Sequence, residues 1–260
     1  MKKRYQAVVA YEGTDFAGWQ IQPQGRTVQG ALQAALREIT GEDARVNCSG
    51  RTDTGVHARA QVVHVDLETD IPARKLLVAL NARLPEDVRI RALRRVPATF
   101  DARFSATGKE YRYFIWNDPV LPPHLRRMRA HVRTALDLAA MRSAAKALIG
   151  RHDFAAFCAN PGYERHGTVR TLFELRVGKK GPEFTIVARG EGFLYRMVRS
   201  LAGFLIRVGT GELPASAAAE ILESRVRTAR VPTAPAQGLF LWKVDYGRGR
   251  RPHAPHDGVA

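Results

Sequence analysis

The sequence predicts an α+β fold made of two ferredoxin-like halves that share one central, mostly antiparallel sheet of about eight strands. The chain has 260 residues, a length that suits two domains or one large domain. Its hydrophobic pattern gives the element order β-α-β-β-α-β over residues 1–105, and the same order recurs over residues 106–246. We expect strands at the edges of the two halves to pair, with helices on one face of the sheet and an active-site cleft between the halves.

In the first half, apolar residues recur at helical spacing from residue 28 to residue 39, between Thr27 as an N-cap and Gly41 as a helix stop. Pro72 opens a second helix, which must end before Pro85. Short runs of apolar and β-branched residues predict the strands. These strands are expected at residues 4–11, 44–49, 60–66 and 88–96.

In the second half, alternating apolar residues again predict strands, which are expected at residues 109–116, 169–177, 183–189 and 239–245. Helical spacing predicts helices at residues 136–149 and 193–208, and an alanine-rich helix begins near Pro214. The glycines and proline of residues 178–182 predict a turn between two of the strands. Residues 247–260 are basic and without periodicity, so we expect a disordered tail.

The chain carries a large excess of positive charge, with 41 Lys and Arg residues against 25 Asp and Glu residues and a formal net charge of +16. Such a field attracts polyanions, and the guanidinium fork of arginine suits phosphate groups. A genome that favours arginine would give the same composition, so charge alone leaves that alternative open. We expect a nucleic-acid partner, because ordinary cytosolic domains lie near neutrality.

The cysteines and histidines of the chain indicate its compartment and whether it binds a metal. The chain has two cysteines, Cys48 and Cys158, one in each predicted half. They form neither a disulfide framework nor a zinc motif, which fits a reducing cytoplasm. No run approaches the roughly 18 apolar residues of a membrane span. His57, His64 and His152 have no metal ligands at recognisable spacing, so we expect a cytoplasmic protein without metal or membrane.

The loop between the two middle strands of the first half is the strongest candidate for chemistry. Asp53 lies in it between Gly50 and Gly55. Glycines allow sharp turns and the close approach of a ligand, so this carboxylate can project into a cleft. An aspartate between glycines is also a common turn former that accepts backbone hydrogen bonds. Taken alone, the turn interpretation is the more frequent one.

Asp53-Thr54-Gly55 matches the triplet of aspartic proteases, in which two carboxylates share one proton. The chain has no second triplet of this kind, although a homodimer would supply one. Arg51 also precedes Asp53, where the protease triplet normally follows apolar residues. A nearby positive charge keeps the carboxylate ionised, which suits a nucleophile or a base better than a shared proton. The protease interpretation is therefore weak.

One candidate partner of Asp53 is Arg199, in the predicted helix at residues 193–208. The apolar residues of this helix form one stripe, and Arg199 lies on another face. It can pair with Asp53 if the helix packs under the cleft. A solvated basic face is the ordinary alternative.

A second candidate is Tyr111, in the aromatic strand at residues 109–116. Aromatic rings beside basic residues on a sheet form a platform for unstacked bases, although such rings are more commonly part of the core. The segment that follows, residues 124–133, contains four arginines and two histidines. That density suits contact with a phosphate backbone.

The residues from Gly50 to Ala58, GRTDTGVHA, closely resemble the signature of the tRNA pseudouridine synthase A family. The resemblance extends over nearly the whole chain, in blocks that keep their order. These blocks are residues 11–20, residues 100–105 with Lys109, Tyr111 and Tyr113, and residues 152–154, 192–199 and 234–239. The resemblance implies an isomerase that converts uridine to pseudouridine at positions 38, 39 and 40, in the anticodon arm of tRNA. It implies that the glycosidic C–N bond breaks, the base rotates and a C–C bond forms, without a cofactor.

The resemblance also implies roles for individual residues. Asp53 matches the catalytic aspartate, which attacks the substrate covalently or acts as a base at the sugar. Tyr111 matches the tyrosine that stacks on the target base and assists the late proton transfer. Arg199 matches the basic residue that pairs with the aspartate, and Arg51 matches an arginine that helps to open the base from the stem. The family forms homodimers with tRNA spanning both subunits, so a homodimer is expected here.

Two other functions compete with this one. In a noncatalytic RNA-binding module, the charge and the aromatic residues would matter while Asp53 only shaped a turn. An Asp-dependent hydrolase would instead release free uracil or cleave phosphodiesters. An isomerase is distinguished from both by forming pseudouridine in an RNA chain of unchanged length.

Overall fold

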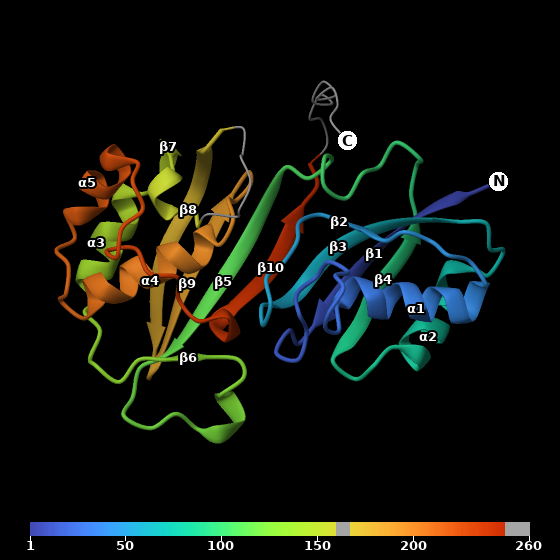
Figure 1. Ribbon diagram of the computed structural model, residues 1–260, viewed down its shortest axis with the longest axis horizontal. Helices are drawn as coiled ribbons and strands as arrows, with labels where there is room; N and C mark the ends of the chain where they lie inside the picture. The colour runs from blue at the N-terminus through green and yellow to red at the C-terminus, as the bar shows by residue number, and fades with distance from the viewer. Residues whose placement is uncertain (160–166, 248–260) are drawn as a thin grey trace.

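One large sheet forms the centre of the molecule (Figure 1). The computed structural model describes residues 1–159 and 167–247. The predicted tail at residues 247–260 therefore lies, apart from Gly247, outside the described residues. The main path of the sheet has the strand order β4-β1-β3-β10-β5-β9-β8-β7, with β2 beside β3 and β6 beside β5. The strands are β1 (Lys3–Tyr11), β2 (Asn47–Cys48), β3 (His57–Leu67), β4 (Val88–Arg95), β5 (Gly108–Trp116), β6 (Ala130–His131), β7 (Gly150–Asp153), β8 (Val169–Lys180), β9 (Glu183–Gly190) and β10 (Leu239–Asp245).

The strand pairs are antiparallel except for β3 with β10 and β5 with β6. The prediction of an α+β fold with one large, mostly antiparallel sheet is confirmed. The description of its two ends as ferredoxin-like halves, divided near residue 105, stays a prediction.

Five α-helices and three short 3-10 helices are present in the described ranges. The α-helices are α1 (Val28–Thr40), α2 (Ala73–Arg83), α3 (Leu138–Ala147), α4 (Met197–Gly209) and α5 (Ala217–Ser224), and the 3-10 helices are η1 (Pro123–Leu125), η2 (Ala155–Phe157) and η3 (Ala236–Gly238).

The two ends of the sheet meet at the pairing of β3 with β10. The register brings Phe240 beside His57 and Leu241 beside Ala58, so a short parallel contact joins strands far apart in the sequence. The loop that carries Asp53 ends where β3 begins, at His57. The candidate loop therefore lies at the junction of the two ends of the sheet.

The first predicted helix has the ends that its sequence indicates. Thr27 caps α1, because its side chain accepts a hydrogen bond from the backbone N–H of Gly30. Gly41 ends the helix in the left-handed conformation, with φ 73°, and its N–H donates to Arg37 O. Pro72 likewise precedes α2, as predicted.

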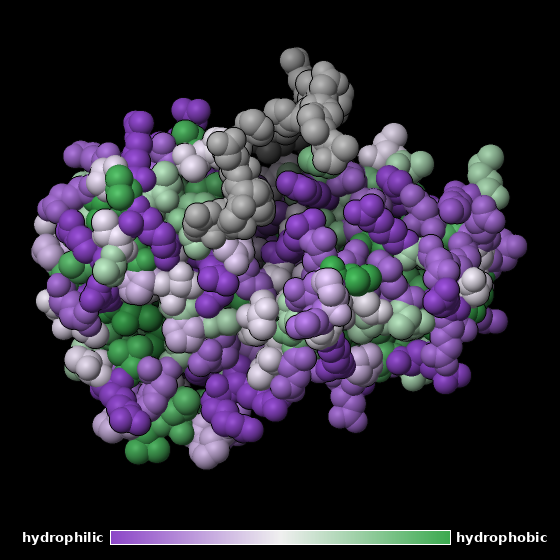
Figure 2. Space-filling view, viewed as in Figure 1, coloured by the Kyte–Doolittle hydropathy of each residue, from purple (hydrophilic) through white to green (hydrophobic). Residues whose placement is uncertain are grey.

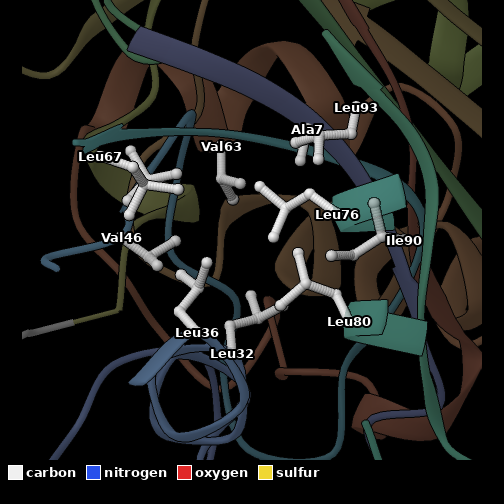
Figure 3. Close-up of a pocket in the computed structure, with 11 residues that line it drawn as sticks. Ala7, Leu32, Leu36, Val46, Val63, Leu67, Leu76, Leu80, Ile90 and Leu93 are labelled. Carbon is white, nitrogen blue, oxygen red and sulfur yellow. The ribbon is translucent and has the colours of Figure 1, made fainter. Parts of the chain in front are cut away.

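Helices α1 and α2 cover the same face of the sheet, because side chains from both meet strand residues in one apolar core (Figure 3). This core encloses a cavity of about 20 Å³. Its lining has no polar group to hold a water or a ligand, so this space belongs to packing rather than to function. The lining residues are Ala7, Leu32, Leu36, Val46, Val63, Val65, Leu67, Leu76, Leu80, Ile90 and Leu93.

Helix α4 is the most deeply buried helix of the other end, with Met197, Leu201 and Phe204 fully covered. It begins at Met197 rather than at the predicted residue 193, because Arg196 adopts a left-handed φ of 56° just before it. In Figure 1, α4 and α1 both lie in front of the sheet. Polar side chains dominate this visible face of the molecule (Figure 2).

Several strand predictions need correction. Strand β2 spans only Asn47–Cys48 instead of residues 44–49, and β8 continues through Lys180 into the predicted turn. Strands β6 and β7 were not expected, since their two and four residues show no alternation. Within the described ranges, no helix is long and apolar enough to cross a membrane.

Candidate active site

The Asp53 loop is held against the segment that follows β1. Trp19 N–H donates to Thr52 O at 3.0 Å, and Gly55 N–H donates to Phe16 O at 3.4 Å. The two segments approach so closely that a Cβ on Gly13 would lie 2.0 Å from Val56 O. Glycine is therefore required at position 13, and the conformation of the loop depends on the neighbouring segment as well as on its own turn.

Buried polar groups fix the beginning of the loop. Ser49 Oγ donates to Gln61 Oε1 at 2.7 Å, and Gln61 Nε2 donates to Gly50 O at 2.7 Å. The hydroxyls of Tyr11 and Thr52 are 2.8 Å apart. Sequence patterns alone do not single out most of these polar residues as supports of the loop. Gln61 gave the one usable signal, as a polar residue at an inward position of an apolar strand.

His57 fixes the end of the loop. Its side chain is completely buried and stacks on the ring of Phe240, with ring centroids 4.5 Å apart. The backbone N–H of Gly13 donates to Nδ1 at 3.0 Å. Burial lowers the pKa of His57, so the ring is neutral near pH 7 and Nδ1 can accept this hydrogen bond.

The carboxylate of Asp53 pairs with Arg199 of α4. Arg199 Nη1 lies 3.1 Å from Asp53 Oδ2, and Arg199 Nε donates to Ala234 O at 2.8 Å, which orients the guanidinium. The side chains of Asp53 and Arg199 are 21% and 13% exposed, so the pair is shielded from solvent while remaining reachable. Arg196 Nε is 3.9 Å from the same oxygen. Among the described residues, Asp53 Oδ1 has no hydrogen-bond partner.

This arrangement bears on the turn interpretation of Asp53. The backbone carbonyl of Asp53 accepts from Val56 N–H at 3.1 Å, which closes a turn. Within the described chain, its carboxylate contacts the arginines Arg199 and Arg196 and accepts no hydrogen bond from a backbone N–H group of the loop. The backbone of Asp53 therefore closes the turn. Its side chain is not needed for the turn and pairs with Arg199 instead.

Tyr111 lies on β5, opposite Leu241 of β10 and Ala188 of β9. Its side chain is 8% exposed, and its ring meets the ring of Phe193 edge to face at a centroid distance of 5.1 Å. Burial raises the pKa of Tyr111, and the nearby Tyr11 and Asp53 groups raise it further. The phenol is therefore neutral at physiological pH and lies in the same region as the Asp53 carboxylate.

Arg51 is placed differently from the other candidates. Its side chain is exposed, and it forms no ion pair or hydrogen bond among the residues that the structure describes. The structure thus brings Asp53, Arg199 and Tyr111 together, and it leaves Arg51 at the solvent edge of the loop. The described residues also hold no group of three or more His, Cys, Asp or Glu side chains placed to bind a metal ion.

Two arginines of the basic segment at residues 124–133 are already paired. Arg127 forms ion pairs with Glu12 at 3.2 Å and Asp15 at 2.8 Å. Arg129 pairs with Glu183 at 2.6 Å. These two arginines therefore tie the segment to the loop after β1 and to the start of β9, which leaves less free charge in the segment than its composition indicates.

Comparison with known proteins decides the family. A family model described as tRNA pseudouridine synthase matches residues 7–105 and 144–247, which include both Asp53 and Arg199. The chain belongs to the tRNA pseudouridine synthase A family. It is therefore an isomerase, and the resemblance inferred from the loop at residues 50–58 is confirmed.

Curated relatives of this synthase match almost end to end. The tRNA pseudouridine synthase A of Brevibacillus brevis is 48% identical over 244 residues, covering 94% of this chain and 100% of that one. That of Halalkalibacterium halodurans is 45% identical over 249 residues, covering 95% and 94%. Among solved structures, an archaeal box H/ACA sRNP Nop10-Cbf5 complex aligns with 78% of this synthase and 44% of that chain, at 14% identity and a TM-score of 0.33.

Proposed function

We propose that this chain isomerises uridine to pseudouridine at positions 38, 39 and 40 in the anticodon arm of tRNA. We also propose that it works in the cytoplasm as a homodimer. The observation that carries the catalytic part is the Asp53 carboxylate held by Arg199 beside Tyr111. The positions and the dimer rest on the resemblance of the loop at residues 50–58 and of the ordered blocks around it. The compartment rests on the two free cysteines.

The overall reaction balances without a second reactant. The bond between uracil N1 and the ribose C1′ breaks, the base rotates, and a bond between C5 and C1′ forms. The proton on C5 is lost and N1 gains a proton, so product and substrate contain the same atoms. Positioned acid–base groups and a carboxylate therefore suffice, and no cofactor or metal is required.

Asp53 is the catalytic carboxylate in this proposal. Arg199 holds Oδ2, while Oδ1 has no partner in the described part of the chain and is available to the substrate. An oxygen held in this way can attack the substrate covalently or remove a proton at the sugar. Either role requires the target nucleotide to leave the base stack and enter the site.

Tyr111 and Arg51 act on the base. The neutral phenol of Tyr111 can stack on the target uracil through its ring and can exchange a proton through its hydroxyl. Arg51 is exposed at the rim of the loop, where it can take the space vacated in the stem when the base is extruded. The net charge of +16 favours binding of the polyanionic arm.

Asp53→Asn tests the catalytic assignment, since it removes the charge with little change in shape. The variant is expected to bind tRNA with unchanged affinity and to form no pseudouridine in single-turnover reactions, mapped position by position. Asp43→Asn is the matched control, because Asp43 lies on the surface and its one ion pair in the described part of the chain is with Arg37, at 2.8 Å. Near-normal product from Asp53→Asn would refute the assignment and favour a noncatalytic role for the loop.

Mapping also tests the positions. Product at uridines outside 38, 39 and 40 would refute the anticodon-arm assignment while leaving the isomerase intact. Free uracil or shortened RNA would instead identify a hydrolase. Sedimentation of the purified protein tests the dimer, which is expected at about twice the 28.9 kDa of the chain.

A further inference from the structure

Lys109 is a cation inside the site to which the proposed mechanism gives no role. It lies on β5 two residues before Tyr111, and since side chains alternate along a strand, both point to the same face. Lys109 Nζ donates to Ser49 O at 2.6 Å. A Cβ on Gly50 would lie 2.9 Å from this nitrogen. The ammonium group therefore lies directly against the beginning of the catalytic loop.

Among the residues that the structure describes, no acidic group balances the charge of Lys109. An ammonium group has three N–H donors, and within residues 1–159 and 167–247 its one hydrogen-bond partner is the neutral carbonyl of Ser49. No carboxylate pairs with it in these ranges. Burial lowers the pKa of Lys109 to about 8. Burying a cation without an anion is unfavourable, so an anion that enters the site would be bound strongly.

Further positive charge gathers at the same place. Arg51 follows Gly50 directly, and its charge acts together with that of Lys109 on the Cys48 thiol. Arg103 acts on Lys109 as a like charge, which also lowers the pKa of Lys109. The guanidinium of Arg103 lies 5.3 Å from the ring centroid of Phe104, and no ion pair engages it among the described residues. Arg51 and Lys109 thus both act on Cys48 near the beginning of the loop, and Arg103 lies within electrostatic range of Lys109. None of these three cations forms an ion pair with a described residue.

We propose that Lys109 and Arg103 bind a phosphodiester of the RNA backbone next to the target uridine. This inference rests on the proposed function and identifies the part of the substrate that this corner of the site receives. The phosphate supplies the missing negative charge. Its oxygens accept hydrogen bonds from the two N–H groups of Lys109 that do not bond to Ser49 O. Arg51 adds to the field, and the guanidinium of Arg103 offers a fork that fits phosphate oxygens.

The position of this phosphate contact gives it a consequence for catalysis. Phosphate contacts fix the register of a nucleic acid on a protein without reading its sequence. Lys109 touches the RNA backbone and the carbonyl of Ser49 at the same time, four residues before Asp53. It therefore sets the distance between the backbone of the target nucleotide and the catalytic carboxylate.

The test is the salt dependence of tRNA binding by the full-length protein. Lys109→Met and Arg103→Gln are each expected to weaken binding about tenfold at low salt, the loss typical of a charged hydrogen bond. Each is also expected to reduce the slope of log affinity against log salt concentration by about 0.7 to 0.9, the value for one lost phosphate contact. Lys75→Met and Arg74→Gln are matched controls on the exposed side of α2, and they are expected to keep the wild-type affinity and slope.

Several outcomes would overturn the inference. If Lys109→Met lowers kcat while affinity and slope stay at wild-type values, Lys109 only positions the loop. If Lys109→Met fails to fold, the variants Lys109→Arg and Arg103→Gln test the inference in its place. Lys109→Arg must then keep the wild-type slope, and Arg103→Gln must show the reduced slope. Pseudouridine mapping with the wild-type protein separates this test from that of the proposed function. A wild type that modifies tRNA, with variants of unchanged slope, refutes the phosphate contact alone.

Discussion

Arg199 Nη1 lies 3.1 Å from Asp53 Oδ2, although 146 positions separate the two residues in the chain. This contact joins the loop before β3 to the first turn of α4, and so it connects the two ends of the sheet through the site. Its environment is only partly accessible, since the two side chains are 13% and 21% exposed. Such a pair is screened less than a surface ion pair, and its loss should be measurable.

Arg199→Ala should lower the single-turnover rate of pseudouridine formation by about 100-fold, because an unsupported carboxylate loses both its charge partner and its orientation. It should also reduce the free energy of unfolding by about 1–3 kcal/mol, measured with urea. Arg196→Ala is the control, since Arg196 is 3.9 Å from the carboxylate and 41% exposed, and its effect on the rate should be much smaller. Equal rate losses in both variants would contradict a special role for Arg199.

Tyr111→Phe should separate the two roles of the tyrosine. The ring and its contact with Phe193 remain, so tRNA affinity should be kept, while Tyr111→Ala should lose stacking worth about 1–3 kcal/mol. The rate with Phe should fall about 100-fold or more if the hydroxyl transfers a proton. A Phe variant as fast as the wild type would restrict Tyr111 to stacking.

Arg51→Ala should leave the free energy of unfolding within about 0.5 kcal/mol of the wild-type value, because the side chain is exposed. Its activity on a uridine paired in a stem should fall. Activity should recover on a stem–loop in which the target uridine is mismatched, because a mismatched base costs less to extrude. A variant equally slow on both RNAs would show that Arg51 does not open the base.

Gly13→Ala should displace the catalytic loop, because its new Cβ would lie 2.0 Å from Val56 O. We expect a loss of about 1–3 kcal/mol in the free energy of unfolding and a rate lower by about 100-fold. Gly178→Ala is the control, since nothing lies within 4 Å of a Cβ there. Full activity of Gly13→Ala would show that the loop adapts without cost.

The free energy of unfolding should fall as the pH drops below about 6.5, the ordinary pKa of histidine. Burial lowers the pKa of His57 and of His64 in the folded chain. Below about pH 6.5 these two rings therefore bind more protons in the unfolded chain than in the folded chain. The stability contributed by the neutral rings is therefore fully present above pH 6.5 and is lost on acidification. Urea titrations at about pH 7.5 and about pH 5.5 should show a smaller difference for His57→Gln than for the wild type. A difference of the same size would mean that His57 does not titrate in this way.

Much of the fold follows from local patterns in the sequence. Strand β10 spans Leu239–Asp245, as the alternation predicts, and α1 lies between its predicted caps Thr27 and Gly41. Prediction fails where a segment takes its conformation from its partners. The four residues of β7, Gly150–Asp153, have no strand pattern and become a strand by pairing with β8.

Some residues of the candidate site could likewise be named from the sequence, whereas others could not. Asp53, Tyr111, Arg199 and Arg51 could all be named from the residues and from the family resemblance. Most supports of the loop could not, because the hydrogen bonds of Lys109 to Ser49 and of Tyr11 to Thr52 join segments that are far apart in the sequence. The ion pairs of Arg127 were equally hidden, and they show that counting basic residues overestimates the charge free to bind RNA.

The residues alone indicate a carboxylate in a glycine-bounded loop and, through a net charge of +16, a polyanionic partner. The isomerase chemistry comes from the family resemblance. The groups that Asp53 faces are set by the folded chain. The parallel pairing of β3 with β10 joins the two ends of the sheet where the loop enters β3. In the folded chain Arg199 of α4 reaches the carboxylate, and Lys109 contacts the beginning of the loop at Ser49 without an anionic partner among the described residues. The physical reason is that local periodicity depends on neighbours along the chain, whereas the charge and burial of a site depend on groups that only folding brings together.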